Sequence, residues 1–219
     1  MARVIAIDGP SGSGKSSTSR RVGRALGFLH VDSGALYRIM TWQCLAQGVE
    51  TSDPAAVAAC AERVQVECRP ENGALAYYVD GEAPGARIRT PEINAHASPV
   101  ATVKAVRDRI TALLRGMTRY GDLVVEGRDI TTVVFPDSPA RFYLTASPEA
   151  RARRRQLEEV ATGVANQSAE AVKASLLARD AIDSTRAYAP LRKADGVLEI
   201  DSTQLTLDQV VETVLDALP

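Results

Sequence analysis

A loop near the start of the sequence combines glycine, serine and lysine at a spacing that suits phosphate binding. The pattern GxxxxGK[ST], placed between an apolar run and a helical pattern, is matched by Gly9, Gly14, Lys15 and Ser16. Because glycine tolerates positive φ, successive N–H groups there can point at one polyphosphate beside a helix N-terminus. Lys15 would contact the β and γ oxygens, and the Ser16 hydroxyl would bind Mg²⁺. The alternative is an ordinary turn between a strand and a helix.

Two further polar groups directly follow apolar runs. In VDSGALYR, Asp32 and Ser33 would end a strand at the edge where open α/β sheets bind ligands, and Arg38 would lie one turn into the next helix. The alternative is a helix cap with Arg38 on the surface. In VVEGRD, the charges from Glu126 to Asp129 could form a solvated turn or, beside a phosphate-binding loop, could hold a second substrate.

The segment RARRR places several arginines on one predicted helix. At 100° per residue, Arg151, Arg154 and Arg155 share a face and Arg153 points elsewhere. Gly163 is a candidate hinge, so a mobile phosphate lid is one interpretation. A solvated face and a nucleic-acid patch are the others.

A charged stripe continues an apolar one along the helix expected from Ser168 to Tyr188. The residues that share this narrow stripe are Val172, Leu176, Arg179, Asp183 and Arg186. Charged residues that continue the core-facing side of a helix indicate a water-filled cleft next to that helix. The alternative is a partly exposed ion pair between Arg179 and Asp183, which would contribute well under about 1 kcal/mol.

The elements that would position these groups alternate along the chain. Strands are expected at residues 3–7, 28–31, 123–126, 140–144 and 198–200, and a helix is expected at residues 15–26. Helical patterns separate the strands, which predicts a five-stranded parallel sheet with helices on both faces. Between about Thr51 and Ser98, VQVEC and ALAYYV flank ENG, which predicts a small inserted antiparallel sheet.

Composition narrows the class of protein. The 219 residues suit one α/β domain with insertions, and the formal net charge of −1 gives no basic field for nucleic acid or anionic membrane. Three cysteines without a C-x-x-C pair favour reduced thiols, and two histidines make a zinc cluster improbable. No apolar run reaches 18 residues, and we expect a soluble cytoplasmic protein.

These motifs together resemble bacterial cytidylate kinases, a family of nucleoside-monophosphate kinases. The resemblance runs along nearly the whole chain, through GPSGSGKSS, DSGALYR, IRTPEINAHAS, EGRDITTVVFPD, ARARRR, RDAIDSTRAYAPL and EIDSTQLTLDQVV. It implies a single P-loop kinase domain, residues 1–219, with a monophosphate-binding insert at 42–98 and a helical lid at 151–166. It also implies ATP-dependent phosphorylation of CMP and dCMP. Ser16 and Ser17 stand where many relatives have Gly and Thr, and Arg153 where His is also seen.

The resemblance assigns roles to individual residues. Lys15, Arg128, Arg154 and Arg155 would act in catalysis, with Mg²⁺ held by Ser16 and Asp32 in its outer sphere. ATP would bind Gly9, Pro10, Ser11, Gly12, Ser13, Gly14, Lys15, Ser16 and Ser17. CMP would bind through three groups of residues. Its phosphate would meet Arg38, Arg128 and Arg186, with Ser33 nearby; its ribose Arg179 and Asp183; and its base Ser98, Arg107 and Asp129.

Other functions make different demands on the sequence. A kinase for shikimate or gluconate would have no use for several arginines and a large insert. A GTPase switch needs D-x-x-G and N-K-x-D segments, which this chain lacks. A nucleic-acid-binding module would show steep salt dependence. We expect a monomer that binds ATP and CMP or dCMP, without nucleic acid or membrane partners.

Overall fold

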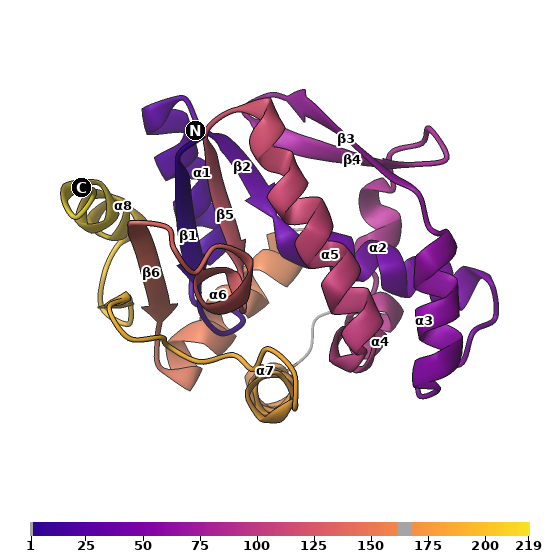
Figure 1. The fold of residues 1–219 in the computed structure, drawn as a ribbon. Coiled ribbons are helices and arrows are strands. Elements are labelled where there is room, and N and C mark those ends of the chain that lie inside the picture. Colours follow the sequence, from indigo (N-terminus) through magenta and orange to yellow (C-terminus); the bar gives the residue numbers. More distant parts are fainter. Residues whose placement is uncertain (1, 162–167) are drawn as a thin grey trace.

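The apolar runs of the sequence form the centre of one sheet. The computed structural model describes residues 2–161 and 168–219, and its strands follow the order β3-β4-β2-β5-β1-β6-β7 (Figure 1). Their bounds are β1 Val4–Asp8, β2 Leu29–Asp32, β3 Val66–Glu71, β4 Ala74–Val79, β5 Leu123–Gly127, β6 Ala140–Thr145 and β7 Leu198–Asp201. The five expected strands are therefore present, each within about two residues of its predicted bounds.

Those five strands run parallel, so their carboxyl ends meet at one edge of the sheet. The central strand β1 pairs with β5 and β6, which places Ile7 opposite both Glu126 and Phe142. Gly9 follows β1 at this edge with φ near 149°. A Cβ at Gly9 would lie 1.9 Å from the Leu144 carbonyl oxygen, so only glycine lets the chain turn there.

The predicted inserted sheet is a hairpin that extends the main sheet instead of forming a second one. Strands β3 and β4 pair antiparallel through the turn at Asn72 and Gly73, which both have positive φ. The His30 N–H donates to the Gly73 carbonyl at 3.0 Å, and this joins the hairpin to β2. The hairpin covers what would otherwise be an exposed edge. The expected count of five strands thus becomes seven.

Helices cover both faces of the sheet, as the strand pattern predicted. They are α1 Lys15–Leu26, α2 Ser33–Ala46, α3 Pro54–Arg63, α4 Pro91–Thr102, α5 Lys104–Gly116, α6 Pro148–Ala161, α7 Ala169–Thr185 and α8 Leu207–Asp216. Short turns are η1 Gly85–Arg89, η2 Met117–Tyr120 and η3 Ile130–Val134. Ile5 and Ile7 pack with α1 and α8, whereas Ala6 joins the core beneath α2 and α5. Alternate residues of β1 thus serve two separate cores.

The arginine-rich segment forms α6, which packs against α7 through Ala152, Val172 and Leu176. Ser168 caps α7 by accepting a hydrogen bond from the Ala171 N–H, as the helix start near Ser168 predicted. The proposed hinge Gly163 and the rest of the expected lid after residue 161 lie outside the described residues. Within the described part of the chain, every helix is too short or too polar to cross a membrane.

Candidate functional site

The phosphate-binding loop lies between β1 and α1, at the carboxyl edge of the sheet. Gly12 and Gly14 have φ of 76° and 95°, and helix α1 begins directly at Lys15. Lys15 is buried, and its Nζ donates to the Pro10 carbonyl at 2.7 Å. Burial, with the charge of Arg128 adding to it, lowers the pKa of Lys15 to about 7. The loop therefore has the strand, turn and helix context that its sequence pattern required.

Ser16, the next residue, faces a carboxylate. Its hydroxyl donates to Glu126 Oε2 at 2.8 Å, and His30 Nε2 lies 3.0 Å from the other oxygen, Oε1. Hydroxyl and carboxylate oxygens are the donors that Mg²⁺ prefers, so this pair fits a magnesium ion bound beside Lys15. Among the described residues there is no cluster of three or more histidine, cysteine or acidic side chains that would suit zinc.

Asp32, which was expected in the outer sphere of the metal, has other partners. Its carboxylate accepts from Arg38 at 3.1 Å, from Arg89 at 3.2 Å and from the Ala35 N–H. Burial alone would raise the pKa of Asp32, but Arg38 and Arg89 hold it near 2. The acidic side chain that contacts Ser16 is instead Glu126, which ends the neighbouring strand. Arg89 lies in the insert, and the sequence reasoning missed it.

Several arginines converge at the same edge with donors left unpaired. Arg128 Nε donates to Asp183 at 3.0 Å, and Arg186 lies 3.5 Å from the other oxygen of that carboxylate. Within the described residues, Arg38 and Arg179 each keep a buried Nε without a hydrogen-bond partner, as does one terminal nitrogen of Arg186. Burial and the charge of Arg128 lower the pKa of Arg179 to about 10. Converging, unpaired cationic donors make a site for an anion with several oxygens.

The charged stripe on α7 has the orientation that its spacing predicted. Val172, Leu176 and Asp183 are buried along that face, and Arg186 directly follows the helix and is also buried. Asp183 forms ion pairs with Arg128 and Arg186. The alternative interpretation from the sequence was an ion pair of Asp183 with Arg179, and that pair is not among these contacts. The helix thus contributes a carboxylate to the arginine cluster.

A buried polar pair lies beyond the arginines. Arg107 is 1% exposed, and its Nη2 lies 2.5 Å from Asp129 Oδ2 while Nη1 donates to the Ala101 carbonyl. The Tyr37 ring lies 5.2 Å from the Arg107 guanidinium, a contact that sequence reasoning missed. Ser98 is also buried, and its hydroxyl has no hydrogen-bond partner in the part of the chain that the structure describes. These fixed donors and acceptors can recognise the polar edge of a flat ligand.

Asp8 connects the two halves of this site. Its carboxylate, fully buried at the end of β1, accepts from the Ile130 N–H and from both the N–H and the hydroxyl of Thr131. Burial raises the pKa of Asp8 to about 6, with the bonds from Thr131 opposing that rise and Asp129 adding to it. The loop that carries Arg128 and Asp129 is therefore fastened to the strand that carries the phosphate-binding loop.

The arginines of α6 have distinct positions. Arg153 is exposed, whereas Arg154 donates to the hydroxyl and the carbonyl of Ser202 at 2.9 and 2.6 Å. Arg151 is buried and donates to the Ser11 carbonyl and to Asp180, whose carboxylate also accepts from the Ser11 N–H. Helix α6 is thus fastened to the phosphate-binding loop. The contacts of Arg151 with Asp180 and Ser11 were not foreseen, because they join residues 29 and 140 positions apart.

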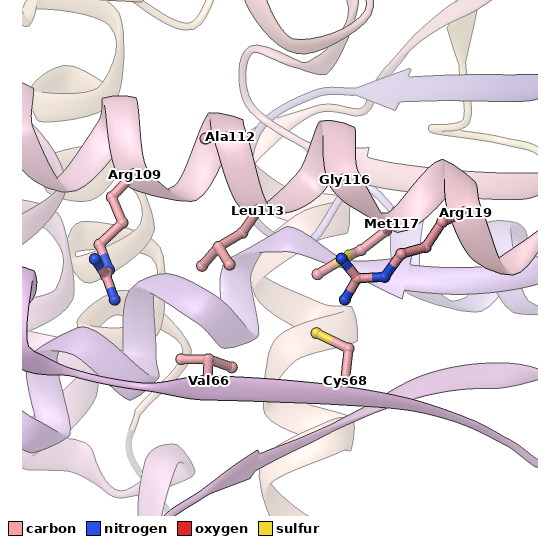
Figure 2. A pocket seen from close by; sticks show the side chains of 8 residues that line it. All are labelled: Val66, Cys68, Arg109, Ala112, Leu113, Gly116, Met117 and Arg119. Atoms are coloured by element: carbon pink, nitrogen blue, oxygen red, sulfur yellow. The ribbon is translucent and has the colours of Figure 1, made fainter.

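Two shallow cavities lie elsewhere and do not include the phosphate-binding loop. One, of about 320 Å³, is lined by Trp42 of α2, Arg87 of η1 and Ile93 of α4, among others. The other, of about 300 Å³, separates α5 from the hairpin strand β3 (Figure 2). Its lining is Val66, Cys68, Arg109, Ala112, Leu113, Gly116, Met117 and Arg119. Mainly apolar walls with one arginine toward each end do not make a phosphate-transfer site.

Comparison with known proteins adds the family. The model of the protein family described as cytidylate kinase matches residues 5–219 of this chain. A protein named cytidylate kinase from Streptomyces avermitilis is 46% identical over 216 residues, which are 98% of this chain and 91% of that protein. One from Shouchella clausii is 40% identical, with 97% and 94% covered. A solved structure of an uncharacterized protein from Eubacterium ventriosum has a TM-score of 0.52 at 10% identity, covering 98% of this chain and 96% of that one, and supports the fold alone.

Proposed function

The chain belongs to the cytidylate kinase family, and we propose that it transfers the γ-phosphoryl group of ATP to the 5′-phosphate of CMP or dCMP. The observation that carries this proposal is one sheet edge that holds both a P-loop lysine and a group of arginines with unpaired donors. Two polyanions can be brought together only where cations face both of them. The products are ADP and the pyrimidine nucleoside diphosphate.

ATP binds in the P-loop, residues 9–17. The N–H groups at the start of α1 face its phosphates, and the Lys15 ammonium moves from the Pro10 carbonyl to the β and γ oxygens. Ser16 would bind Mg²⁺ through its hydroxyl oxygen, and Glu126 accepts a hydrogen bond from that hydroxyl. Magnesium, when bound, neutralises charge on the β and γ oxygens.

CMP binds beside the arginine cluster. Arg38, Arg128 and Arg186 hold its phosphate, with the Ser33 hydroxyl nearby, and Arg179 and Asp183 contact its ribose. Support comes from the unpaired donors of Arg38, Arg179 and Arg186. The attacking group is an oxygen of that phosphate, which is already anionic. No general base is therefore required, and the arginines act by orienting the oxygen and reducing repulsion from ATP.

The cytosine base contacts Ser98, Arg107 and Asp129. Support comes from the burial of all three and from the absence of a partner for the Ser98 hydroxyl. Cytosine presents an amino donor at N4 and acceptors at N3 and O2. The Asp129 carboxylate accepts from N4, while Ser98 and Arg107 donate to the acceptors.

The arginines Arg154 and Arg155 act on the donor phosphates when the lid, residues 151–166, closes. Arg154 donates to the hydroxyl of Ser202, and that hydroxyl donates to the carbonyl of P-loop residue Ser13. This short path to the loop supports a role near ATP. Closure would exclude water and so limit hydrolysis of ATP.

The setting of the reaction is part of the same proposal. The protein acts as a monomer in the cytoplasm, in pyrimidine nucleotide metabolism, with no nucleic-acid or membrane partner. Support comes from its net charge of −1 and its three free cysteines, Cys44, Cys60 and Cys68.

A coupled assay of ADP release tests the proposed reaction directly. The purified protein is supplied with ATP, Mg²⁺ and one of CMP, dCMP, UMP, AMP or GMP. Rapid ADP release with CMP and dCMP, and formation of the matching diphosphates, is the expected result. Release that is independent of the monophosphate, or that occurs only with a purine monophosphate, would contradict the proposal.

The lowered pKa of Lys15 predicts proton uptake when nucleotide binds. With a pKa of about 7, empty Lys15 is about 0.9 deprotonated at pH 8 and about 0.1 at pH 6. Bound phosphates favour the ammonium form, so Lys15 should take up nearly one proton on ADP binding at pH 8 and almost none at pH 6. Calorimetry in buffers of different ionisation enthalpy measures this uptake.

Lys15→Arg is the matched control for proton uptake, because arginine stays charged at both pH values. When this variant binds ADP, the extra proton uptake that the wild type shows at pH 8 relative to pH 6 should be absent. Equal proton uptake by this variant and the wild type at pH 8 would show that another group titrates.

Neutralising the lid pair should affect turnover more than acceptor binding. We expect Arg154→Gln with Arg155→Gln to lower kcat at least about 10-fold and to change KM for CMP less than about twofold, since these arginines act on ATP during closure. Steady-state kinetics with varied CMP checks this split. Arg153→Gln is the control, because Arg153 is exposed on the same helix and should leave kcat unchanged. If the double variant kept the kcat of the wild type, Arg154 and Arg155 would have no role in catalysis and would only form a solvent-exposed helix face.

A further inference from the structure

One buried histidine has no part in the reaction described so far. His30 lies in β2 with 4% exposure, and its Nε2 is 3.0 Å from Glu126 Oε1. The register of β2 with β5 places His30 opposite Val124, so Glu126 lies two residues further along the neighbouring strand on the same face. Carboxylate oxygens accept hydrogen bonds, so we assign to His30 the tautomer in which Nε2 is the donor to Glu126.

The carboxylate of Glu126 is held at both oxygens. Oε1 faces His30, and Oε2 accepts a hydrogen bond from the Ser16 hydroxyl, with 2.8 Å between the two oxygens. The backbone carbonyl of Glu126 accepts from the Ser33 hydroxyl at 2.6 Å, which fixes the end of the strand as well. The side chains of Glu126 and His30 are each about 5% exposed, so water does not compete for these bonds.

We propose that His30 is a positioning residue for magnesium. By fixing Oε1 it keeps Oε2 directed at Ser16. The Ser16 hydroxyl donates its hydrogen bond to Glu126, and a lone pair of its oxygen would then face the metal. This inference rests on the proposed kinase function, which supplies the magnesium nucleotide. His30 touches neither substrate, and it acts only through Glu126.

An imidazole suits this position for a physical reason. Glutamate has more side-chain torsions than aspartate, so an unrestrained Glu126 could turn away from Ser16. A lysine or arginine at position 30 would hold the carboxylate but would also add a fixed positive charge close to Lys15 and the metal. Histidine can donate one hydrogen bond without requiring that charge.

The test compares three substitutions of His30. The side-chain amide of glutamine can put an N–H near the place of the histidine Nε2, whereas that of asparagine is too short and leucine cannot donate. The readout is the Kd of ADP measured by calorimetry without and with Mg²⁺, and the ratio of the two values reports metal coupling at the site. The Kd of CMP is measured alongside, and thermal unfolding checks the fold.

His30→Leu and His30→Asn should reduce the metal coupling about 10-fold, whereas His30→Gln should stay close to the wild type. Glu126→Gln should reduce metal coupling about as much as His30→Leu. The double variant should reduce it little further, because both substitutions break the same contacts from His30 through Glu126 to Ser16. The Kd of CMP should not change. If the leucine variant does not fold, the contrast between glutamine and asparagine still tests the proposal.

Wild-type metal coupling in both the asparagine and the leucine variants would overturn the inference, as would equal losses with glutamine and asparagine. A general loss of ADP and CMP binding would also overturn it, since that result indicates a structural role. These outcomes are separate from the proposed function, which stands or fails on CMP-dependent ADP release by the wild-type protein.

Discussion

Replacing Lys15 with methionine should reduce kcat/KM for phosphoryl transfer by about 10²- to 10³-fold or more. Methionine keeps most of the apolar stem but removes the charge that faces the transferred group, and the loss of one such group has this typical effect. The coupled assay, with CMP saturating and ATP varied, measures kcat/KM for ATP. Near-normal turnover in a folded Lys15→Met protein would refute the P-loop assignment.

The same variant should remove a pH dependence of stability. The pKa of Lys15 is about 7 in the folded protein and near 10.5 when unfolded, so the unfolded chain binds more protons between these values. The free energy of unfolding of the empty wild type should therefore rise with pH from about 7 to 10.5, relative to Lys15→Met. Urea unfolding at several pH values measures the difference. Lys193→Met, at a partly exposed lysine paired with Glu199, controls for general charge effects.

Base selection should be the second large effect. Uracil replaces the N4 donor of cytosine with an acceptor and protonates N3, which reverses the pattern at two atoms. A buried site built for one pattern leaves its polar groups unpaired with the other base, which can lower kcat/KM for that other base by up to about 10⁴-fold. We expect kcat/KM for CMP and dCMP to exceed that for UMP and AMP by at least about 10-fold.

Asp129→Asn should narrow the preference for CMP over UMP, because an amide can rotate to donate to O4 of uracil. The substitution also breaks the buried pair with Arg107 and is expected to lower stability. The ratio of kcat/KM values for the two substrates is the proper measurement, since a smaller folded fraction affects both equally. Asp195→Asn, at an exposed position, is the control. An unchanged ratio in Asp129→Asn would refute the role of Asp129 in reading the base.

Local patterns were sufficient to predict much of this site. Helix α1 begins and ends at the predicted residues, Lys15 and Leu26, because a glycine-rich loop and Gly27 bound it. The stripe on α7 identified Asp183 as inward-facing, because helical periodicity fixes which residues share a face. Arg186 is buried as well, but the helix ends at Thr185 and not at the predicted Tyr188, so Arg186 lies just beyond it in an extended conformation. Both predictions depend on residues close together in the chain.

The missed features depend on contacts between distant residues. His30 and Glu126 are 96 positions apart, and only the pairing of β2 with β5 places them on one face. The hairpin was recognised from its turn, but no local pattern shows that β4 joins the edge of β2. The resemblance assigned Asp32 to the outer sphere of the metal, whereas its carboxylate accepts hydrogen bonds from Arg38 and Arg89 in the structure.

The bonds from Asp8 to Ile130 and Thr131 have a consequence for engineering. Because the Asp8 carboxylate fastens the loop of Arg128 and Asp129 to the strand that leads into the phosphate-binding loop, the relative placement of the two loops is fixed when the chain folds. On the proposed function, the two reacting phosphates are therefore aligned by the fold and not anew in each catalytic cycle. Insertions between residues 128 and 134 should therefore be poorly tolerated. The turn at Asn72 and Gly73, far from this tether, is the better place to add a tag or open the chain for circular permutation.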